Sequence, residues 1–345
     1  MPDGDNINKP DHTPIEVFVV NYYGGEKLLN CVKSLLASMY RPFRVRIIDN
    51  PPRDPVLDEI ITLYPHVEII EPPANVGYAG AIHIAAEKCQ SDLLIICNND
   101  LLFSPGCIPK LVATYHQTRA AAVSPRIVNP NEGHLEANYN ATLNPLYFLI
   151  NGVFADRSRA VYPSGACFLV ERKALMECLP PKELFLYYED VFIGILLRMS
   201  GREVIQANEA VVHHLHGYSV NRLLQYRLAF YRERNRHVCM FVFYSSATIL
   251  KLALLIPLTV MHTLWKELMG EASFPGAAMG WVHASLSWSF IRKLRLNLPH
   301  KGIGGDDVCA GNFTSRLIHD DAPAADTINR FGRWLFRFLR IKTLH

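Results

Sequence analysis

Residues 15–100 alternate between short apolar runs rich in β-branched residues and longer segments in which apolar residues recur with helical spacing. Near-continuous apolar strands joined by helices are typical of a parallel sheet that is covered on both faces. The alternation therefore predicts an α/β domain with a mostly parallel sheet. The expected strands are 15–23, 43–50, 67–73 and 91–100, and the expected helices are 24–40, 54–65 and 77–89. Farther along, we expect a strand leading into a helix at 160–175 and two short strands within 203–219.

Polar side chains gather where these strands end, namely Asn21, Asp49, Asn50, Asn98, Asn99 and Asp100. Ligands of open α/β sheets bind outside the carboxyl ends of the strands. Asp100 can hold a divalent metal there through hard oxygen ligands, although Asn and Asp also favour turns for purely local reasons. The Gly- and Ala-containing turn at 71–81 would let a nucleotide approach the backbone closely. A nucleotide site is therefore predicted at this edge, with His213, His214 and His216 following a later strand.

Two adjacent acids, Glu189 and Asp190, precede an apolar run that is spaced like one face of a helix, and Gly201 follows where a C-cap glycine belongs. Acids in a first helical turn complement the free N–H groups and the helix dipole, so capping is one explanation of the pair. A carboxylate there can also act as a general base. Repulsion between neighbouring acids raises one pKa, which favours one base and one helper. For an isolated pair capping is the more common explanation, but together with the family resemblance carried by the order of all the motifs we interpret the pair as catalytic first and capping second.

The order of these motifs resembles that of family 2 glycosyltransferases of the GT-A fold, and most closely their rhamnosyltransferase-like branch. "VVNYYGGEKLLNCVKSL", "IIDN", "NVGYAGAIHIA" and "NND" are similar to the first strand and helix, the nucleotide-binding segments and the metal motif of that branch. "YPSGACFLVERKAL", "LFLYYEDV" and "ANEAVVHHLHGYS" resemble its acceptor-side and catalytic segments, and "YRERNRH" also fits. The resemblance covers residues 15 to 240, approximately, and implies a Rossmann-like GT-A catalytic domain.

The resemblance also implies roles for the matching residues. Asp190 matches the general base, with Glu189 beside it on the acceptor side. Asp100 matches the metal ligand that bridges to the donor diphosphate, and His213 matches the histidine that completes the metal shell in some relatives. The implied cofactor is a divalent ion, Mg²⁺ or Mn²⁺. The implied donor nucleotide contacts are Val20, Asn21, Tyr22, Asp49, Asn75, Gly77, Asn98 and Asn99, and Gly165 and Ala166 would line the donor sugar or the acceptor.

The sequence departs from the family pattern at several of these motifs. The acid usually found two residues after the Glu-Asp pair is Phe192 here, and the asparagine usual late in the glycine turn is His83. The second strand continues as "NPPRDP" rather than as a Ser-Thr-Asp run. Asp100 is the single acid of the metal motif, because Asn98 and Asn99 offer only neutral oxygens. We therefore expect modest metal affinity and altered nucleoside and acceptor contacts.

The character of the chain changes after residue 222. Two uncharged runs, 238–250 and 252–265, are separated by Lys251, and each is shorter than the ~20 apolar residues that span a bilayer. A span through both would place a lysine in the membrane at a cost of about 2.5–3.5 kcal/mol, so interfacial or re-entrant helices are expected. The Arg and aromatic stripe at 328–342 resembles a basic amphipathic helix for an anionic membrane surface, or alternatively a helix that packs on the catalytic domain.

These observations predict a disordered tail at 1–14, a GT-A domain at 15–236 and a helical, membrane-associated region at 237–345. The apolar fraction of 50% against a charged fraction of 19% agrees with a membrane-facing or heavily buried portion. A net charge of +3 does not indicate nucleic acid as a partner. The 8 cysteines form no CxxC pair, so neither a zinc site nor a disulfide framework is indicated, and a reducing cytoplasm fits best. The sequence indicates no oligomeric state.

The resemblance implies an inverting transferase that moves a sugar from a nucleotide-diphosphate donor to a hydroxyl of a glycan or a polyprenyl-diphosphate-linked acceptor. The setting would be cell-surface polysaccharide synthesis on the inner face of the cytoplasmic membrane, with rhamnose from its thymidine diphosphate donor as the sugar suggested. One alternative is a sugar-phosphate nucleotidyltransferase, for which only Lys27 stands in the expected basic phosphate loop. Another is a non-catalytic membrane-bound scaffold, against which the Glu-Asp pair and Asp100 argue.

Overall fold

The computed structural model describes residues 13–38, 40–41, 43–128, 142–143, 146, 149–150, 160–215, 222–268 and 273–298, together with residues 330, 334, 335 and 337–339. Most of the tail predicted at 1–14, most of the segment 129–159, and His216 lie outside these residues.

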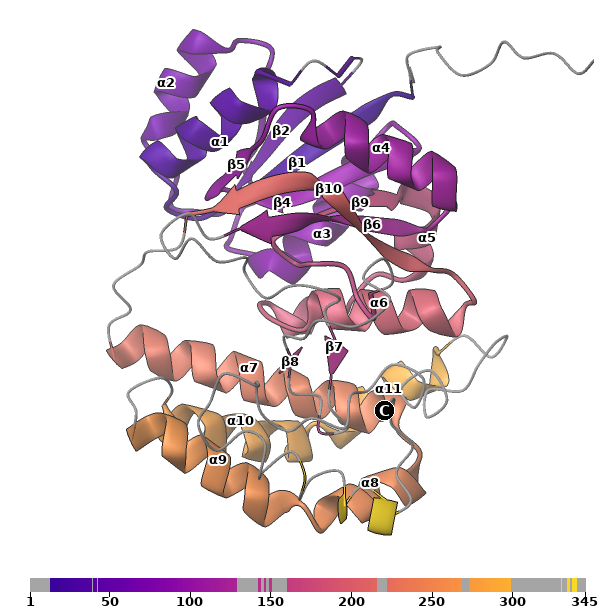
Figure 1. Ribbon diagram of the computed structural model, residues 1–345. Helices are drawn as coiled ribbons and strands as arrows, with labels where there is room; N and C mark the ends of the chain where they lie inside the picture. The colour runs from indigo at the N-terminus through magenta and orange to yellow at the C-terminus, as the bar shows by residue number, and fades with distance from the viewer. Residues whose placement is uncertain are drawn as a thin grey trace, which may run out of the picture.

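An eight-stranded sheet organises the first two thirds of the protein (Figure 1). Its spatial order is β3-β2-β1-β4-β9-β6-β10-β5. The first four of these strands are mutually parallel, β6 and β10 are also parallel, and β9 runs antiparallel between β4 and β6. The strands are β1 (Ile15–Asn21), β2 (Phe43–Asp49), β3 (Glu68–Ile70), β4 (Leu93–Asn98), β5 (Leu101–Phe103), β6 (Ala122–Val128), β9 (Cys167–Glu171) and β10 (Val204–His214). A separate two-stranded sheet pairs β7 (Thr142–Leu143) with β8 (Leu149–Ile150). The predicted mostly parallel α/β sheet is confirmed.

Helices cover both faces of the large sheet, which explains why β1 is buried along its whole length. The helices α1 (Glu26–Leu36), α2 (Val56–Leu63) and α4 (Cys107–Thr118) share one apolar core with one face of the sheet. The helices α3 (Gly77–Lys88), α5 (Arg172–Glu177) and α6 (Glu189–Met199) share a second core with the other face. Gly201 follows α6 with a positive φ of 77°, as expected of a glycine beyond a helix C-terminus.

One strand differs from expectation. The sequence predicts two short strands within 203–219, whereas the structure has the single strand β10, whose pairing with β6 shifts register between Ala207 and Val211. Asn208 and Glu209 at this irregularity are exposed and interrupt the apolar pattern, but the backbone continues as one strand.

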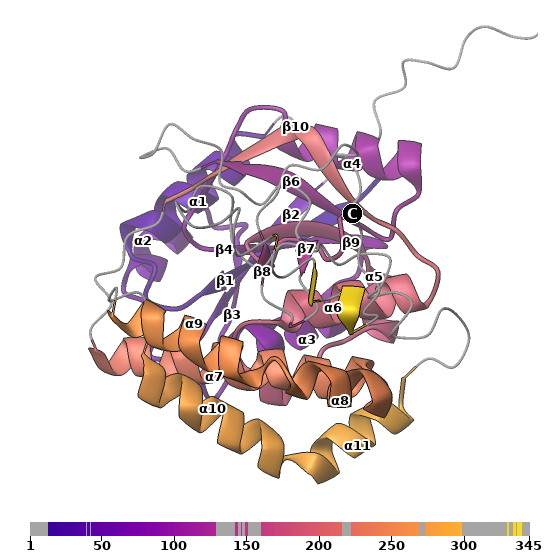
Figure 2. The ribbon, with the colours of Figure 1, turned by 60° about the horizontal axis from the view of Figure 1, so that its bottom comes forward.

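A layer of helices lies beneath α6 (Figures 1 and 2). It consists of α7 (Arg222–Phe243), α8 (Ser246–Ala253), α9 (Ile256–Leu268), α10 (Phe274–Leu286) and α11 (Trp288–Leu296). Figure 1 shows α7 between α6 and the pair α9 and α10, so the boundary predicted at 236/237 lies inside α7. Val238, Val242 and Phe243 are buried in the core that α3 and α6 share, so the first apolar run begins as core. No helix in the described ranges combines the length and the apolar character needed to cross a bilayer.

Candidate active site

A buried hydrogen-bond network joins the carboxyl ends of β1, β2 and β4. Asn21 is fully buried, and its Nδ2 donates to Oδ1 of Asp49 at 2.6 Å and to Oδ2 of Asp54 at 3.1 Å. Its Oδ1 accepts from Asn99 Nδ2 at 2.5 Å and from the Gly24 N–H at 3.1 Å. The polar residues predicted at this edge therefore meet, and the shared bonds hold the strand ends in register.

Asp49 is inaccessible, with 1% of its surface exposed. Its two oxygens accept from Asn21 and from the Asp54 N–H, at 2.6 and 3.0 Å. Burial raises the pKa of Asp49, while these hydrogen bonds lower it. In this state Asp49 orders the strand ends, and its predicted nucleoside contact stays a prediction. Sequence reasoning did not find Asp54, whose only signal is an acid in the turn after the second strand.

The glycine turn before α3 is fixed by two asparagine side chains. Asn50 Oδ1 accepts from the Val76 N–H at 2.9 Å, and Asn75 Oδ1 accepts from the Gly77 N–H at 2.9 Å. Gly77 has a φ of 66°, and a Cβ there would lie 2.3 Å from the carbonyl oxygen of Phe185, so only glycine fits. The predicted nucleotide turn is thereby packed directly against the segment that precedes Glu189 and Asp190.

Two aromatic rings stand at the open end of β1. Tyr22 and Tyr23 are about half exposed, with their ring centroids 4.6 Å apart, and Val20 just before them is nearly buried. Of the nucleotide contacts predicted at the end of β1, Tyr22 is therefore accessible, while Asn21 is buried.

The structure brings Asp100 to His214 and not to His213. Oδ1 of Asp100 lies 3.1 Å from Nε2 of His214, whereas Nε2 of His213 lies 3.2 Å from the Ser104 hydroxyl. The cause is the alternation of side chains along β10, which turns consecutive histidines to opposite faces. The metal pair inferred from the resemblance, Asp100 with His213, is thus not assembled here, and His214 takes the place beside Asp100. The sequence could have indicated His214 as an alternative, because it directly follows His213 in the same expected strand.

The chemistry around Asp100 suits a cation. Its Oδ1 is buried and, apart from the contact with His214 at 3.1 Å, has no hydrogen-bond donor among the described residues. Carboxylate oxygen and imidazole nitrogen are both ligands of divalent metals. Among the described residues, however, no group of three or more His, Cys, Asp or Glu side chains could hold a metal ion. A cation at Asp100 would therefore need further ligands from a bound molecule or from water.

A chain of contacts links this edge to the Glu-Asp pair. The Asn98 N–H donates to the Ala166 carbonyl at 2.9 Å, and the neighbouring Gly165 N–H donates to Oδ2 of Asp190 at 3.0 Å. The Tyr78 hydroxyl donates to the Gly165 carbonyl at 2.5 Å. A Cβ at Gly165 would lie 2.8 Å from the same Asp190 oxygen. Gly165 and Ala166 thus lie between the strand end and Asp190, where the resemblance put the sugar or acceptor face.

The two acids begin α6 in different environments. Asp190 is partly exposed, and its Oδ1 accepts from the Val191 N–H at 2.8 Å, which is a capping contact. Burial raises the pKa of Asp190 to about 6, although its backbone hydrogen bonds lower it. Glu189 is buried, and its Oε2 receives no hydrogen bond from the described residues. Burial and then the charge of Asp190 raise the pKa of Glu189 well above its usual range. With a pKa of about 6, Asp190 is mostly ionised near pH 7, whereas burial and the charge of Asp190 favour the protonated form of Glu189.

The backbone that delivers these acids is strained. Phe185, Tyr187 and Tyr188 have φ values of 63°, 70° and 69°. Each non-glycine residue held in such a region costs of order 1–3 kcal/mol and persists only when its surroundings enforce it. Strain of this kind immediately before the acids indicates that their position is imposed by the neighbouring structure.

Asn235 of α7 supplies much of that restraint. It is fully buried, and its Nδ2 donates to the carbonyls of Leu184, Leu186 and Tyr187, each at 2.8 Å. The adjacent Arg234 also donates to the Leu184 carbonyl, at 2.9 Å. Asn235 lies in "YRERNRH", which the sequence pointed to only as a motif, so its role could not be found without the fold.

Two departures from the family pattern have a packing explanation. Phe192 is buried on α6 against Phe243 of α7, with ring centroids 4.9 Å apart, where an acid would face an apolar core. Nε2 of His83 lies 2.7 Å from the Pro180 carbonyl oxygen, so this residue joins α3 to the segment before α6.

Matches to known proteins identify the family of this domain. The family model described as "Glycosyl transferase family 2" matches residues 16–179. The protein carries a family 2 glycosyltransferase domain. The enzyme is 27% identical, over 239 residues, to an N-acetylglucosaminyl-diphospho-decaprenol L-rhamnosyltransferase of Mycobacterium tuberculosis, a match that covers 60% of this chain and 78% of the relative. The resemblance inferred from the motifs is confirmed.

Solved structures show the GT-A fold. GalNAc-T7 with UDP, GalNAc and Mn²⁺ superposes with a TM-score of 0.58 at 17% identity, covering 69% of this glycosyltransferase and about half, 49%, of GalNAc-T7. The mannosyltransferase PcManGT from Pyrobaculum calidifontis, in complex with GDP-Man and Mn²⁺, gives a TM-score of 0.52 at 14% identity, covering 85% and 88% of the two chains. At such identities the likeness establishes the fold of the glycosyltransferase and not its ligands.

Proposed function

We propose that this glycosyltransferase moves a sugar, with inversion at the anomeric carbon, from a nucleoside diphosphate to a hydroxyl of a lipid-linked acceptor. The observation that carries the proposal is Asp190, a partly exposed carboxylate with a pKa raised to about 6. Gly165 and Ala166 connect it by hydrogen bonds to the strand end before Asp100. A base and an edge suited to a diphosphate in one site are what such a transfer needs.

Asp190 serves as the general base. The acceptor oxygen attacks the anomeric carbon while Asp190 takes the hydroxyl proton, and the bond from that carbon to the diphosphate oxygen breaks with its electron pair. Because one base serves one face of the sugar, attack comes from the side opposite the leaving group, and the configuration inverts. Burial and the charge of Asp190 favour the protonated form of Glu189, which keeps the charge of the pair near a single unit.

Asp100 and His214 are the residues that would hold a divalent ion. The ion would supply neutralisation of the diphosphate charge. Two protein ligands suit Mg²⁺ or Mn²⁺, since Mg²⁺ in particular commonly completes its shell with substrate phosphates and water. The Mn²⁺ in the GalNAc-T7 and PcManGT structures supports this proposal.

The substrates follow from the mycobacterial relative. Its name describes an L-rhamnosyltransferase acting on N-acetylglucosaminyl-diphospho-decaprenol. It supports a rhamnose donor, with thymidine diphosphate as the nucleotide suggested by resemblance, and a polyprenyl-diphosphate-linked N-acetylglucosamine as acceptor. We place the reaction in cell-surface polysaccharide synthesis on the inner face of the cytoplasmic membrane, with the protein bound peripherally.

A transfer assay tests this function. Purified full-length protein is incubated with a panel of nucleotide sugars and a short-chain polyprenyl-diphosphate N-acetylglucosamine, with Mn²⁺, with Mg²⁺ or with EDTA. The expected result is one glycosylated lipid product and equimolar nucleoside diphosphate, both dependent on metal. Nucleoside diphosphate released without a glycosylated product from any donor, or nucleotide transfer to a sugar phosphate, would overturn the assignment.

A further inference from the structure

The helix α9 turns two threonines inward. Thr259 and Thr263 are 7% and 5% exposed, and their hydroxyls donate to the carbonyls one helical turn earlier, at 3.3 and 2.9 Å. The exposed side chains of this helix include Met261, Leu264, Trp265 and Leu268, and Leu268 is 85% exposed. Their spacing of three, four and seven residues places them on one stripe. A helix adapted to water would show the opposite pattern.

The neighbouring helix α10 turns small residues inward and large apolar residues outward. It packs on α7 through small residues: a Cβ at Gly276 would lie 2.3 Å from the Tyr226 carbonyl oxygen, and one at Gly280 would lie 2.7 Å from that of Phe230. Glycines four residues apart allow such close helix contact. The larger apolar residues Met279, Val282 and Leu286 are more than half exposed instead.

Both helices lie on the side of α7 that faces away from α6 (Figures 1 and 2). We define the docking face as the exposed stripe of α9 (Met261, Leu264, Trp265, Leu268) together with Met279, Val282 and Leu286 of α10. Large exposed apolar side chains on two neighbouring helices indicate an interaction site, because leaving them in water forfeits the hydrophobic free energy of burial. Small or polar residues inside and large apolar residues outside suit a lipid environment.

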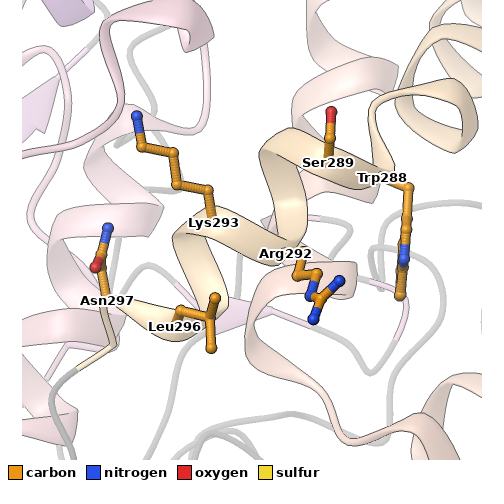
Figure 3. Close-up of a pocket in the computed structure, with 6 residues that line it drawn as sticks. All are labelled: Trp288, Ser289, Arg292, Lys293, Leu296 and Asn297. Carbon is orange, nitrogen blue, oxygen red and sulfur yellow. The ribbon is translucent and has the colours of Figure 1, made fainter.

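Charge identifies the kind of partner. Among the described side chains of 246–298, Lys251, Arg292, Lys293 and Arg295 outnumber one acid, Glu267, whose carboxylate accepts from the Phe274 N–H. On α11, an open cavity of about 500 Å³ is lined by Trp288, Ser289, Arg292, Lys293, Leu296 and Asn297 (Figure 3). Figure 3 shows Trp288 and Arg292 extending from the same side of the helix. Tryptophan beside cations is typical of the headgroup level of a bilayer.

The Arg and aromatic stripe near the C-terminus also presents aromatic and basic side chains to the exterior. Leu335 and Leu339 pack against the core, as the packing explanation of this stripe predicted. Trp334 and Phe338 are 57% and 71% exposed, and Arg337 is exposed beside them. The described part of this helix therefore uses one face to dock on the protein and presents aromatic and basic side chains on the other.

We propose that the docking face inserts into the headgroup region of an anionic bilayer, with Arg292 and Lys293 contacting lipid phosphates. A second copy of the chain is the poorer occupant, because the basic side chains of α11, close to the docking face in sequence, would be brought near those of the other copy and repel them. The helices enter the interface without crossing the membrane, in keeping with their lengths. The inference rests on the proposed function only in that a lipid-linked acceptor would be met at this surface.

Vesicle co-sedimentation of the full-length protein tests the proposal, using phosphatidylcholine vesicles with and without phosphatidylglycerol. Replacement of Leu264 and Leu268 by Gln should lower the bound fraction at limiting lipid at least tenfold at every salt concentration. Arg292→Gln with Lys293→Gln should abolish the preference for anionic vesicles and the sensitivity to salt. The matched control replaces Ile61 and Leu63 of α2, which are similarly apolar and 41% and 50% exposed, and should bind like the wild type.

Two outcomes would overturn the proposal. One is vesicle binding by the Leu264→Gln, Leu268→Gln protein at the wild-type level. The other is a wild-type dimer, measured by light scattering without lipid, that this variant converts to a monomer, which would make the face a self-association surface. Turnover on a water-soluble acceptor analogue separates the two proposals. It should be unchanged in the docking variants, whereas its absence in the wild type would count against the transferase assignment alone.

Discussion

Asp190→Asn should abolish sugar transfer and at the same time stabilise the fold. Asn keeps the shape of the side chain but cannot accept the acceptor proton, and a general base typically supplies 10²–10⁴-fold in rate. We expect a loss of that size in kcat, with little change in donor affinity, because Asp190 bonds Gly165 and Val191 rather than the strand-end network that includes Asn21.

The stability gain follows from the raised pKa. Burial moves the Asp190 carboxyl from 3.8 to about 6, so the folded state binds its proton more tightly than the unfolded state does. The associated stability is present below pH 4 and is lost as pH rises toward 6, which leaves the ionised wild type destabilised by about 3 kcal/mol at pH 7.5. Asn removes this charge but turns its NH₂ toward one of two backbone donors, at a cost of about 1 kcal/mol. The net gain is roughly 2 kcal/mol.

Chemical denaturation at pH 7.5 and at pH 4, with transfer kinetics on the same preparations, measures both effects. The variant should be more stable than the wild type at pH 7.5, and the difference should vanish or reverse at pH 4. Retention of more than about a tenth of wild-type turnover would remove Asp190 from the role of base. Equal stability of the two proteins at pH 7.5 would refute the argument that its charge is buried at a cost.

Four further substitutions test the rest of the site. Glu189→Gln should keep kcat within about tenfold of the wild type, because burial and the charge of Asp190 already favour the neutral form of the native side chain; a loss as large as that of Asp190→Asn would reassign the base. His214→Ala should weaken Mn²⁺-dependent binding of nucleoside diphosphate at least tenfold by calorimetry and leave binding of the bare nucleoside unchanged, while His213→Ala should alter neither; the reverse order would restore the pair inferred from the sequence. Asn235→Asp, which removes the N–H donors without changing shape, should lower kcat about 10²-fold by displacing the acids; a lower melting temperature with unchanged kcat would show a structural role only.

The sheet was predictable because each of its main strands is recognisable from the apolar residues within it. Most strand residues in the runs at 15–23, 43–50 and 91–100 are apolar and buried, since helices cover both faces of the sheet. The prediction divided β10 into two strands because two exposed polar residues interrupt its apolar pattern. The sequence does not reveal that these residues lie at a shift in pairing register within one continuous strand. The run at 238–250 was grouped with a membrane-associated region because a buried core helix and an interfacial helix have the same composition.

The site was predictable in its residue types and less so in its pairings. The Glu-Asp pair, the strand-end asparagines and Gly165 belong to local motifs, and the structure brings them to one edge. Successive side chains of β10 point to opposite faces, so either His213 or His214 can face Asp100. Which of them does so depends on the pairing register of β10, which the sequence does not give. The restraint by Asn235 joins positions about 50 residues apart, which no local pattern encodes.

The pH dependence of kcat/KM for transfer tests the central claim most directly. In the wild type, kcat/KM should fall below pH 6 with one apparent pKa near 6, because only ionised Asp190 accepts the acceptor proton. The residual activity of Asp190→Asn should lack this limb, and Glu189→Gln should leave the limb near pH 6, because burial of Asp190 raises its pKa. A wild-type profile that is flat from pH 5 to 8, or a limb near pH 6 that persists in Asp190→Asn, would contradict the assignment of Asp190 as the base.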